Sequence, residues 1–185
     1  MNVCLSGFMG SGKSFLGRAL ADALPAWRFV DLDACIEETA GKTISDIFRE
    51  EGEARFRALE QTCLERLLVP AEGSGPEDGL ILSLGGGTLM TPACADCVRE
   101  HACCIYLKAS EDTLVERLLA TDIPGRPLLG GAADEPSLRR RVRALLQARS
   151  ATYEACADTI LQTDGRTADE LLAALLSLPC LSAGI

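Results

Sequence analysis

One eight-residue stretch near the N-terminus constrains this chain more than any other feature. Gly7-Phe8-Met9-Gly10-Ser11-Gly12-Lys13-Ser14 matches G-x-x-x-x-G-K-[ST], the phosphate-binding loop of nucleoside-triphosphate enzymes. The apolar run 2–6 predicts a buried strand before the loop, and the pattern in 15–24 predicts an amphipathic helix after it. Such a unit directs backbone N–H groups and the positive helix end at a polyphosphate. The sequence therefore predicts an ATP or GTP site, with Lys13 at the outer phosphates and Ser14 as a ligand of Mg²⁺.

The whole-chain composition limits the partners of this site. The chain has 185 residues, which suits one domain, and its hydrophobic content is 48%. It contains no apolar run of about 18 residues and no basic, cleavable leader, so we expect neither a membrane span nor export, but a cytoplasmic location. The net charge of −9 argues against nucleic acid or an anionic membrane as a partner. Anionic ligands then need local basic side chains, which makes single arginines informative.

Nine cysteines are scattered through apolar runs of the sequence. Their odd number and the absence of an export signal favour free thiols over a disulfide framework. Cys94, Cys97, His101 and Cys103 could alternatively form a zinc site. However, Cys103 begins a predicted buried strand, where cysteine packs as a small hydrophobe, and the spacing is not that of paired zinc knuckles. We therefore favour free thiols.

Two aspartates follow the second predicted strand, 27–30. The carboxyl ends of parallel strands are where α/β sheets bind ligands, so Asp31 could hold the water shell of Mg²⁺. Asp33, one pleat further, would face the same side and could reach a substrate hydroxyl. The alternative is that these residues cap a helix beginning at Ala34. Either aspartate could be a helix cap. That both serve only as caps is less consistent with the neighbouring phosphate loop.

The chain after these aspartates is patterned as helices, with breaks near Gly41 and Gly52. Arg57 lies in the helix that follows the second break. At helical spacing it could simply be a solvated arginine paired with Glu53 or Glu60. The spacing alone favours that interpretation over a role in ligand binding.

Two glycine-containing segments further along indicate ligand contact. Three consecutive glycines, Gly85 to Gly87, follow the predicted buried strand 80–84 and would let a ligand lie against bare backbone. Residues 121–136 are irregular and contain Arg126, which is the usual composition of a mobile lid that closes over phosphates. The alternative is a connecting loop whose arginine is merely solvated.

The remaining pattern completes a repeating strand–helix order. Further strands are predicted at 103–107 and 159–162, a helix begins after Ser110, and a long basic helix contains Arg149. A last helix is predicted at 168–178. The chain should therefore form a three-layer α/β/α domain with a five-stranded parallel sheet, spanning residues 1–185.

Taken together, these motifs resemble one family, the shikimate kinases, small P-loop kinases with a fold of the nucleoside-monophosphate-kinase type. The resemblance covers nearly the whole chain. Its motifs, in order, are G-F-M-G-S-G-K-S at 7–14, D-L-D at 31–33, G-E-A-R-F-R-A-L-E at 52–60, G-G-G at 85–87, G-R-P-L-L at 125–129 and A-R-S-A-T-Y at 148–153.

The resemblance implies transfer of the ATP γ-phosphate to the 3-hydroxyl of shikimate, with Mg²⁺ as cofactor, in a monomer whose helical segment 33–68 binds substrate and whose lid is 121–136. The implied catalytic residues are Lys13, Asp33 and Arg126. The implied ATP-binding residues are Gly10, Ser11, Gly12, Lys13, Ser14, Phe15, Arg117, Arg126 and Asp164. Shikimate would be bound by Asp33, Arg57, Gly85, Gly86, Gly87 and Arg149, and Mg²⁺ by Ser14 directly and by Asp31 through water.

The sequence also departs from the family pattern at a few places. Phe15 stands where these enzymes often carry threonine, the loop 69–79 is longer than usual, and two extra residues separate Arg117 from Arg126.

Two other functions remain as alternatives. One is another small-molecule kinase on the same fold, such as a gluconate kinase. The other is a nucleotide-binding regulatory module without catalysis, although such a module would be expected to lack some of the phosphoryl-transfer residues present here.

Overall fold

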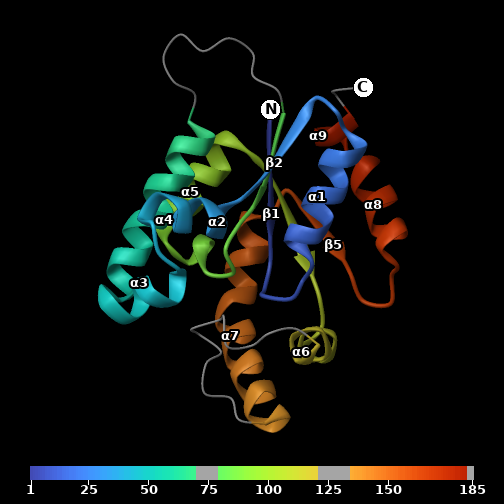
Figure 1. Ribbon diagram of the computed structural model, residues 1–185. Coiled ribbons are helices and arrows are strands. Elements are labelled where there is room, and N and C mark those ends of the chain that lie inside the picture. Colours follow the sequence, from blue (N-terminus) through green and yellow to red (C-terminus); the bar gives the residue numbers. More distant parts are fainter. Residues whose placement is uncertain (70–78, 121–133, 183–185) are drawn as a thin grey trace.

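A computed structural model of the chain describes residues 1–69, 79–120 and 134–182. The described strands are all parallel and form one sheet in the order β2-β3-β1-β4-β5 (Figure 1). The strands are β1 (Asn2–Ser6), β2 (Trp27–Asp31), β3 (Gly79–Ser83), β4 (Cys103–Lys108) and β5 (Thr159–Gln162). The predicted five-stranded parallel sheet is confirmed.

Helices cover both faces of this sheet (Figure 1). One face packs against α1 (Lys13–Ala23), α8 (Ala168–Leu176) and α9 (Pro179–Ser182). The other packs against α2 (Leu32–Ala40), α4 (Gly52–Leu68), α5 (Pro92–His101) and the C-terminal part of α7 (Glu135–Cys156). The remaining elements lie further out: α3 (Ile44–Glu50) packs on α4, α6 (Glu111–Leu119) packs on α7, and a 3₁₀ turn, η1 (Thr88–Met90), precedes α5.

The strands β1, β3 and β4 are mainly apolar because both of their faces are buried, whereas the edge strands β2 and β5 are partly exposed. In β1, Val3 and Leu5 pack with α1 and α8, while the intervening Cys4 packs with α4 and α5. All three side chains are fully buried. This two-sided burial keeps β1 in the centre of the sheet, so that the loop after it leaves from the middle of the sheet's carboxyl edge.

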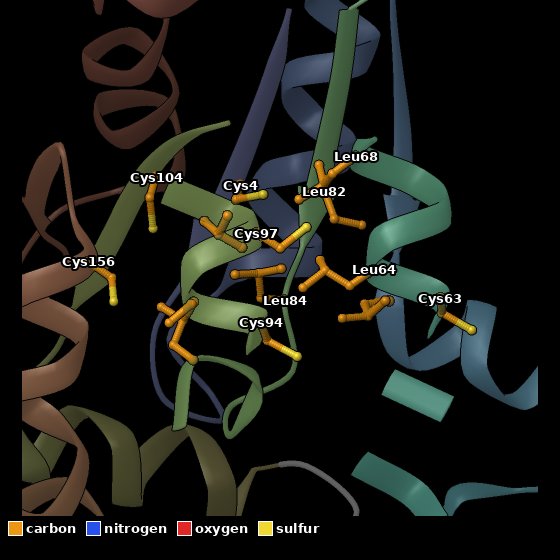
Figure 2. Close-up of a cluster of buried hydrophobic side chains, with 14 of the residues drawn as sticks. Cys4, Cys63, Leu64, Leu68, Leu82, Leu84, Cys94, Cys97, Cys104 and Cys156 are labelled. Atoms are coloured by element: carbon orange, nitrogen blue, oxygen red, sulfur yellow. The ribbon is translucent and has the colours of Figure 1, made fainter. Parts of the chain in front are cut away.

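Cysteines fill much of the core on the α4 and α5 side. Cys94 and Cys97 of α5 lie among leucine side chains, with Cys4 of β1 close by (Figure 2). Burial raises the pKa of the Cys94 thiol to about 12, so it stays protonated at neutral pH. All nine cysteines are free, and no cluster of metal-ligating side chains occurs among the described residues. The structure therefore favours free thiols over the zinc alternative.

The helix after β2 begins earlier than the sequence predicted. Residue 32, not Ala34, is the first residue of α2, because the Asp31 carboxylate caps the helix by accepting a hydrogen bond from Asp33 N at 3.1 Å. Asp33 therefore lies in the first helical turn and not on a strand, so the pleat argument for its direction was wrong. Gly41, with φ of 68°, ends this helix where a break was predicted.

Several other boundaries also moved by a few residues. The lid was predicted to reach residue 136, but Glu135 and Pro136 form the first turn of α7, which Asp134 caps through Ser137 N. The rest of the predicted lid, 121–133, lies outside the described residues, as does most of the 69–79 loop. The last predicted helix ends at Leu176, and α9 comes after it. Within the described ranges, every helix is too short or too polar to serve as a membrane span.

Candidate active site

A cleft of about 600 Å³ opens at the carboxyl ends of the central strands. This is the edge at which parallel α/β sheets bind ligands. Its wall comprises the phosphate loop and the start of α1, the end of β2, parts of α2, α3 and α4, the segment after β3, and residues of α6 and α7. The residues that carry polar chemistry there are Lys13, Ser14, Asp31, Asp33, Arg57, Glu60, Ser83, Arg117 and Arg149.

The phosphate loop has the backbone conformation that its glycines permit. Gly7, Gly10 and Gly12 have φ values of 139°, 82° and 97°, in the region that other residues rarely adopt. A Cβ on residue 7 would lie 2.7 Å from the carbonyl oxygen of Leu107, so the loop could not pack on β4 with a larger residue. Among the described residues, no side chain caps α1 at Gly12, which leaves the first N–H groups of the helix to bind an anion.

Two cations approach this loop from different elements. Lys13 Nζ donates to the carbonyl oxygens of Gly7 at 2.9 Å and Phe8 at 3.0 Å. From α6, Arg117 Nη1 donates to the carbonyl oxygens of Gly10 at 3.3 Å and Ser11 at 3.4 Å. Both side chains also line the cleft, so positive charge lies beside the anion-binding end of α1.

Three oxygen-bearing side chains meet at the base of the cleft. Ser14 Oγ donates to Asp31 Oδ2 at 2.5 Å and lies 3.3 Å from Ser83 Oγ at the end of β3. Hydroxyl and carboxylate oxygens are the donors that Mg²⁺ prefers, and Mg²⁺ is usually held by one or two protein groups together with substrate phosphates and water. The predicted pair Ser14 and Asp31 therefore fits this ion. Ser83 was missed by the sequence analysis, although its position just before Gly85 to Gly87 was a usable signal.

Asp33 is the one strongly perturbed carboxyl group of the described cleft. Its side chain is open to solvent on the cleft side. Desolvation by the protein around it, followed by the like charge of Asp31, raises its pKa to about 6, and the charge of Lys13 opposes this rise. A Cβ on residue 85 would lie only 3.0 Å from Asp33 Oδ1, so the bare backbone of Gly85 makes room for this carboxylate. A group with this pKa can accept a proton near neutral pH.

Arg57 is held in the cleft by a buried carboxylate. Its Nη1 donates to Glu60 Oε2 at 2.7 Å, and Glu60 is fully buried and also accepts a hydrogen bond from Thr88 Oγ1 at 2.6 Å. Arg57 additionally pairs with exposed Glu53 at 3.1 Å. The helical pairing that spacing favoured is therefore present, but it orients the guanidinium toward the cleft instead of leaving it in solvent. Sequence reasoning named Glu60 only as a possible partner of a solvated Arg57, and it assigned no role to Thr88.

The glycines after β3 give a second arginine access to the cleft. Arg149 is buried, and its Nη1 donates to the carbonyl oxygen of Gly86 at 2.9 Å. The Tyr153 hydroxyl donates a short hydrogen bond to the same oxygen. A Cβ on residue 87 would lie 2.7 Å from Arg57 Nη2. The three glycines therefore bring the two guanidinium groups to one part of the cleft.

Comparison with known proteins identifies this arrangement. The family model described as "Shikimate kinase" matches residues 9–178 of the chain. The chain belongs to the shikimate kinase family. It is 41% identical to the shikimate kinase of Chlorobium chlorochromatii over 91% of this chain and 87% of that protein. The shikimate kinase of Thermus thermophilus is also 41% identical, over 92% of this chain and 85% of that protein.

Solved shikimate kinases have the same fold. The Acinetobacter baumannii enzyme, in complex with shikimate, superposes with a TM-score of 0.82 at 29% identity, covering 95% of this chain and 90% of that one. The Bacteroides thetaiotaomicron enzyme gives the same TM-score and identity, covering 95% and 96%. Among the activities that the sequence left open, family membership favours an ATP-dependent kinase acting on shikimate over a gluconate kinase or an inactive module.

Three further residues, which the resemblance assigned to ATP binding, lie in different places. Phe15 lines the cleft with its ring exposed. Asp164 is absent from the cleft wall and instead accepts hydrogen bonds from Ser110 N and Oγ at 2.9 Å, which ties the segment after β5 to the start of α6. Arg126 lies outside the described residues.

An apolar part of the cleft wall was also missed by the sequence analysis. Ile44 and Phe48 from α3, with Phe56 from α4, line the cleft near Arg57. The rings of Phe48 and Phe56 pack at 4.8 Å, and Phe56 lies under the Arg57 guanidinium at 5.1 Å. The resemblance assigned substrate binding to the helical segment 33–68 as a whole, but it named none of these apolar side chains. The arrival of α3 at the cleft depends on the turn that precedes it and on packing against α4, neither of which a local pattern reveals.

Proposed function

We propose that this chain transfers the γ-phosphate of ATP to the 3-hydroxyl of shikimate, in the cleft formed by 7–14, Asp33 and the two guanidinium groups of Arg57 and Arg149. One observation carries the proposal. A phosphate loop and two arginines oriented for an anion share one cleft with a carboxylate whose pKa is about 6. A phosphoryl donor and a carboxylate-bearing alcohol are the two ligands that such a cleft accommodates.

Shikimate binding is assigned to the arginine end of the cleft. A planar guanidinium binds a carboxylate with two parallel hydrogen bonds, and Arg57 and Arg149 are held in place by Glu60 and Gly86 before substrate arrives. In a chain with net charge −9, an anionic substrate needs such a local cationic site. Gly85 to Gly87 would let the substrate ring lie against the backbone.

The reaction itself is mainly positioning and charge stabilisation. As the shikimate 3-oxygen bonds to the γ-phosphorus, Asp33 takes the proton of the hydroxyl, and the bond between the γ-phosphorus and the β–γ bridging oxygen breaks to release ADP. Lys13 and the N–H groups at the start of α1 would stabilise the charge on the phosphates. Ser14 and Asp31 would hold Mg²⁺, which, when bound, neutralises the charge that develops on the phosphate oxygens. Arg126 is proposed as a further cation at the phosphates.

The cellular setting belongs to the same proposal. Nine free thiols suit a reducing compartment such as the cytoplasm. One chain supplies the phosphate loop, both arginines and Asp33, so a monomer is sufficient for the proposed reaction.

The test is ADP release from Mg·ATP in a coupled assay, with shikimate, gluconate and no acceptor run in parallel. We expect turnover with shikimate alone. Arg57→Ala should raise the KM for shikimate by at least tenfold, because one arm of the carboxylate site is lost. Arg55→Ala is the matched control, since Arg55 lies on the same helix but is exposed and pairs only with Glu51 in the described structure. Equal effects of the two variants, or turnover with gluconate, would contradict the proposal.

A further inference from the structure

Phe15, which the resemblance places among the ATP-binding residues, presents an exposed aromatic ring to the cleft, and the proposed phosphoryl transfer does not use that ring. Phe15 is 62% exposed, in the first turn of α1, directly after Ser14. The other large hydrophobic side chains that are exposed in the described parts of the chain are Met1, Val69, Leu119 and Ile160, and none of them lines the cleft. Scattered exposed hydrophobics are ordinary, but an apolar ring on the wall of a binding cleft offers contact area to a ligand.

The direction of the neighbouring Ser14 side chain helps to decide which ligand the Phe15 ring could contact. Ser14 points at Asp31 and Ser83, on the side of the cleft where β2 and β3 end and where Asp33 is located. Successive residues of an α-helix project about 100° apart. Phe15 therefore projects about 100° from the direction of Ser14, and it is exposed, whereas the next residue, Leu16, is buried in the core.

Part of the cleft wall beside the phosphate loop comes from α6. Arg117 and Ala120 line the cleft from the C-terminal end of α6, and Arg117 contacts the phosphate loop at Gly10. The residues assigned to shikimate come from other elements. A nucleotide whose phosphates lie at the start of α1 must extend its ribose and base out of the loop, and Phe15 is an exposed apolar side chain in the first turn of that helix.

We propose that the phenyl ring of Phe15 contacts the nucleoside part of the bound nucleotide, so that it strengthens the binding of ATP and ADP but not of phosphate groups alone. The inference rests on the proposed function, because it assumes that the loop 7–14 binds the phosphates. It assigns to Phe15 a specific role in nucleotide affinity, through apolar contact with the ribose and base.

The experiment compares ADP with inorganic tripolyphosphate, which carries phosphates but no nucleoside. Dissociation constants of both, with Mg²⁺, are measured by calorimetry for the wild type, Phe15→Ala and Phe15→Leu. We expect Phe15→Ala to weaken ADP binding about tenfold, equivalent to about 1.4 kcal/mol, because burying part of a phenyl ring contributes about this much. Phe15→Leu should lose less, and tripolyphosphate affinity should stay within about twofold for both variants.

Kinetics provide a second readout and a matched control. In Phe15→Ala the KM for ATP should rise about as much as the ADP dissociation constant, while the KM for shikimate stays unchanged. Leu119→Ala removes a side chain that is 46% exposed on α6 and outside the cleft wall, and should change neither constant. Equal weakening of ADP and tripolyphosphate would place the ring's effect on the phosphate loop and overturn the inference, as would unchanged ADP affinity. Failure of the wild type to bind either ligand would instead refute the proposed function.

Discussion

Asp33 allows the sharpest prediction, because its ionised carboxylate is proposed to be needed for catalysis but is expected to destabilise the fold. Raising a carboxyl pKa from 3.8 to about 6 corresponds to about 3 kcal/mol, at 1.36 kcal/mol per pKa unit. Asp33 is open to solvent in the cleft, and screening reduces this figure, so we expect about 1 kcal/mol. The pKa is raised on folding, so the folded state binds more protons than the unfolded state between pH 3.8 and 6. The ionised carboxylate therefore destabilises the fold above about pH 6, and this penalty disappears as the pH falls toward 4.

Asp33→Asn should therefore be more stable than the wild type at pH 8 by about 1 kcal/mol, seen as a rise in Tm of about 2–4 °C. The difference should shrink as the pH falls from about 7 to about 4. Turnover should fall about 10²–10⁴-fold, the usual contribution of a general base, while shikimate still binds. Thermal unfolding of the ligand-free protein at several pH values, with calorimetric titration of shikimate, measures these effects.

The control is Glu38→Gln, which removes an exposed carboxylate from the same helix and should change stability by less than about 0.5 kcal/mol. An Asp33→Asn variant no more stable than the wild type at pH 8, or a stability difference independent of pH, would refute the electrostatic destabilisation by Asp33. Unchanged turnover would rule out the base role on its own and leave that destabilisation standing.

Three further predictions concern the other features of the site and the core. Arg57→Ala should lower the free energy of unfolding by about 3 kcal/mol in urea, because it leaves the buried Glu60 carboxylate without its cation, whereas Arg55→Ala should cost less than about 1 kcal/mol. Gly87→Ala should displace the Arg57 guanidinium and raise the KM for shikimate, and a parallel rise in the KM for ATP would mean that the whole cleft is distorted. In thiol titration, fast-reacting groups of the native protein should be confined to the half-buried cysteines, with all nine reacting after denaturation; a purified protein that contains stoichiometric zinc would contradict this view of the core.

The sequence was sufficient to predict the sheet and the phosphate site because those features are local. Apolar runs define the strands, and the residues from Gly7 to Ser14 have their own conformational requirements. The direction of Asp33 was not predictable in this way, because it depends on whether Asp31 or Asp33 caps the following helix. A one-residue difference in helix start rotates each side chain by about 100°.

The supporting contacts of the site were also beyond local patterns. Thr88 and Glu60 are 28 residues apart, yet they share a hydrogen bond under Arg57. Tyr153 and Gly86 are 67 residues apart and meet only because α7 packs against the segment after β3. Resemblance to a family indicated which arginines matter. The tertiary contacts that hold those arginines required the structure.

Because β1 lies at the centre of the sheet, the binding sites of the two proposed ligands are built largely from different segments. The phosphate loop leaves β1 directly, whereas the acceptor site is built from the segments after β2 and β3 together with Arg149 of α7. Insertions or substitutions in α2 or α3 could therefore reshape the acceptor site without disturbing the loop that binds the phosphoryl donor. In a natural or engineered descendant of this fold, the acceptor site could therefore change to bind a different alcohol while the phosphate-binding loop stays the same.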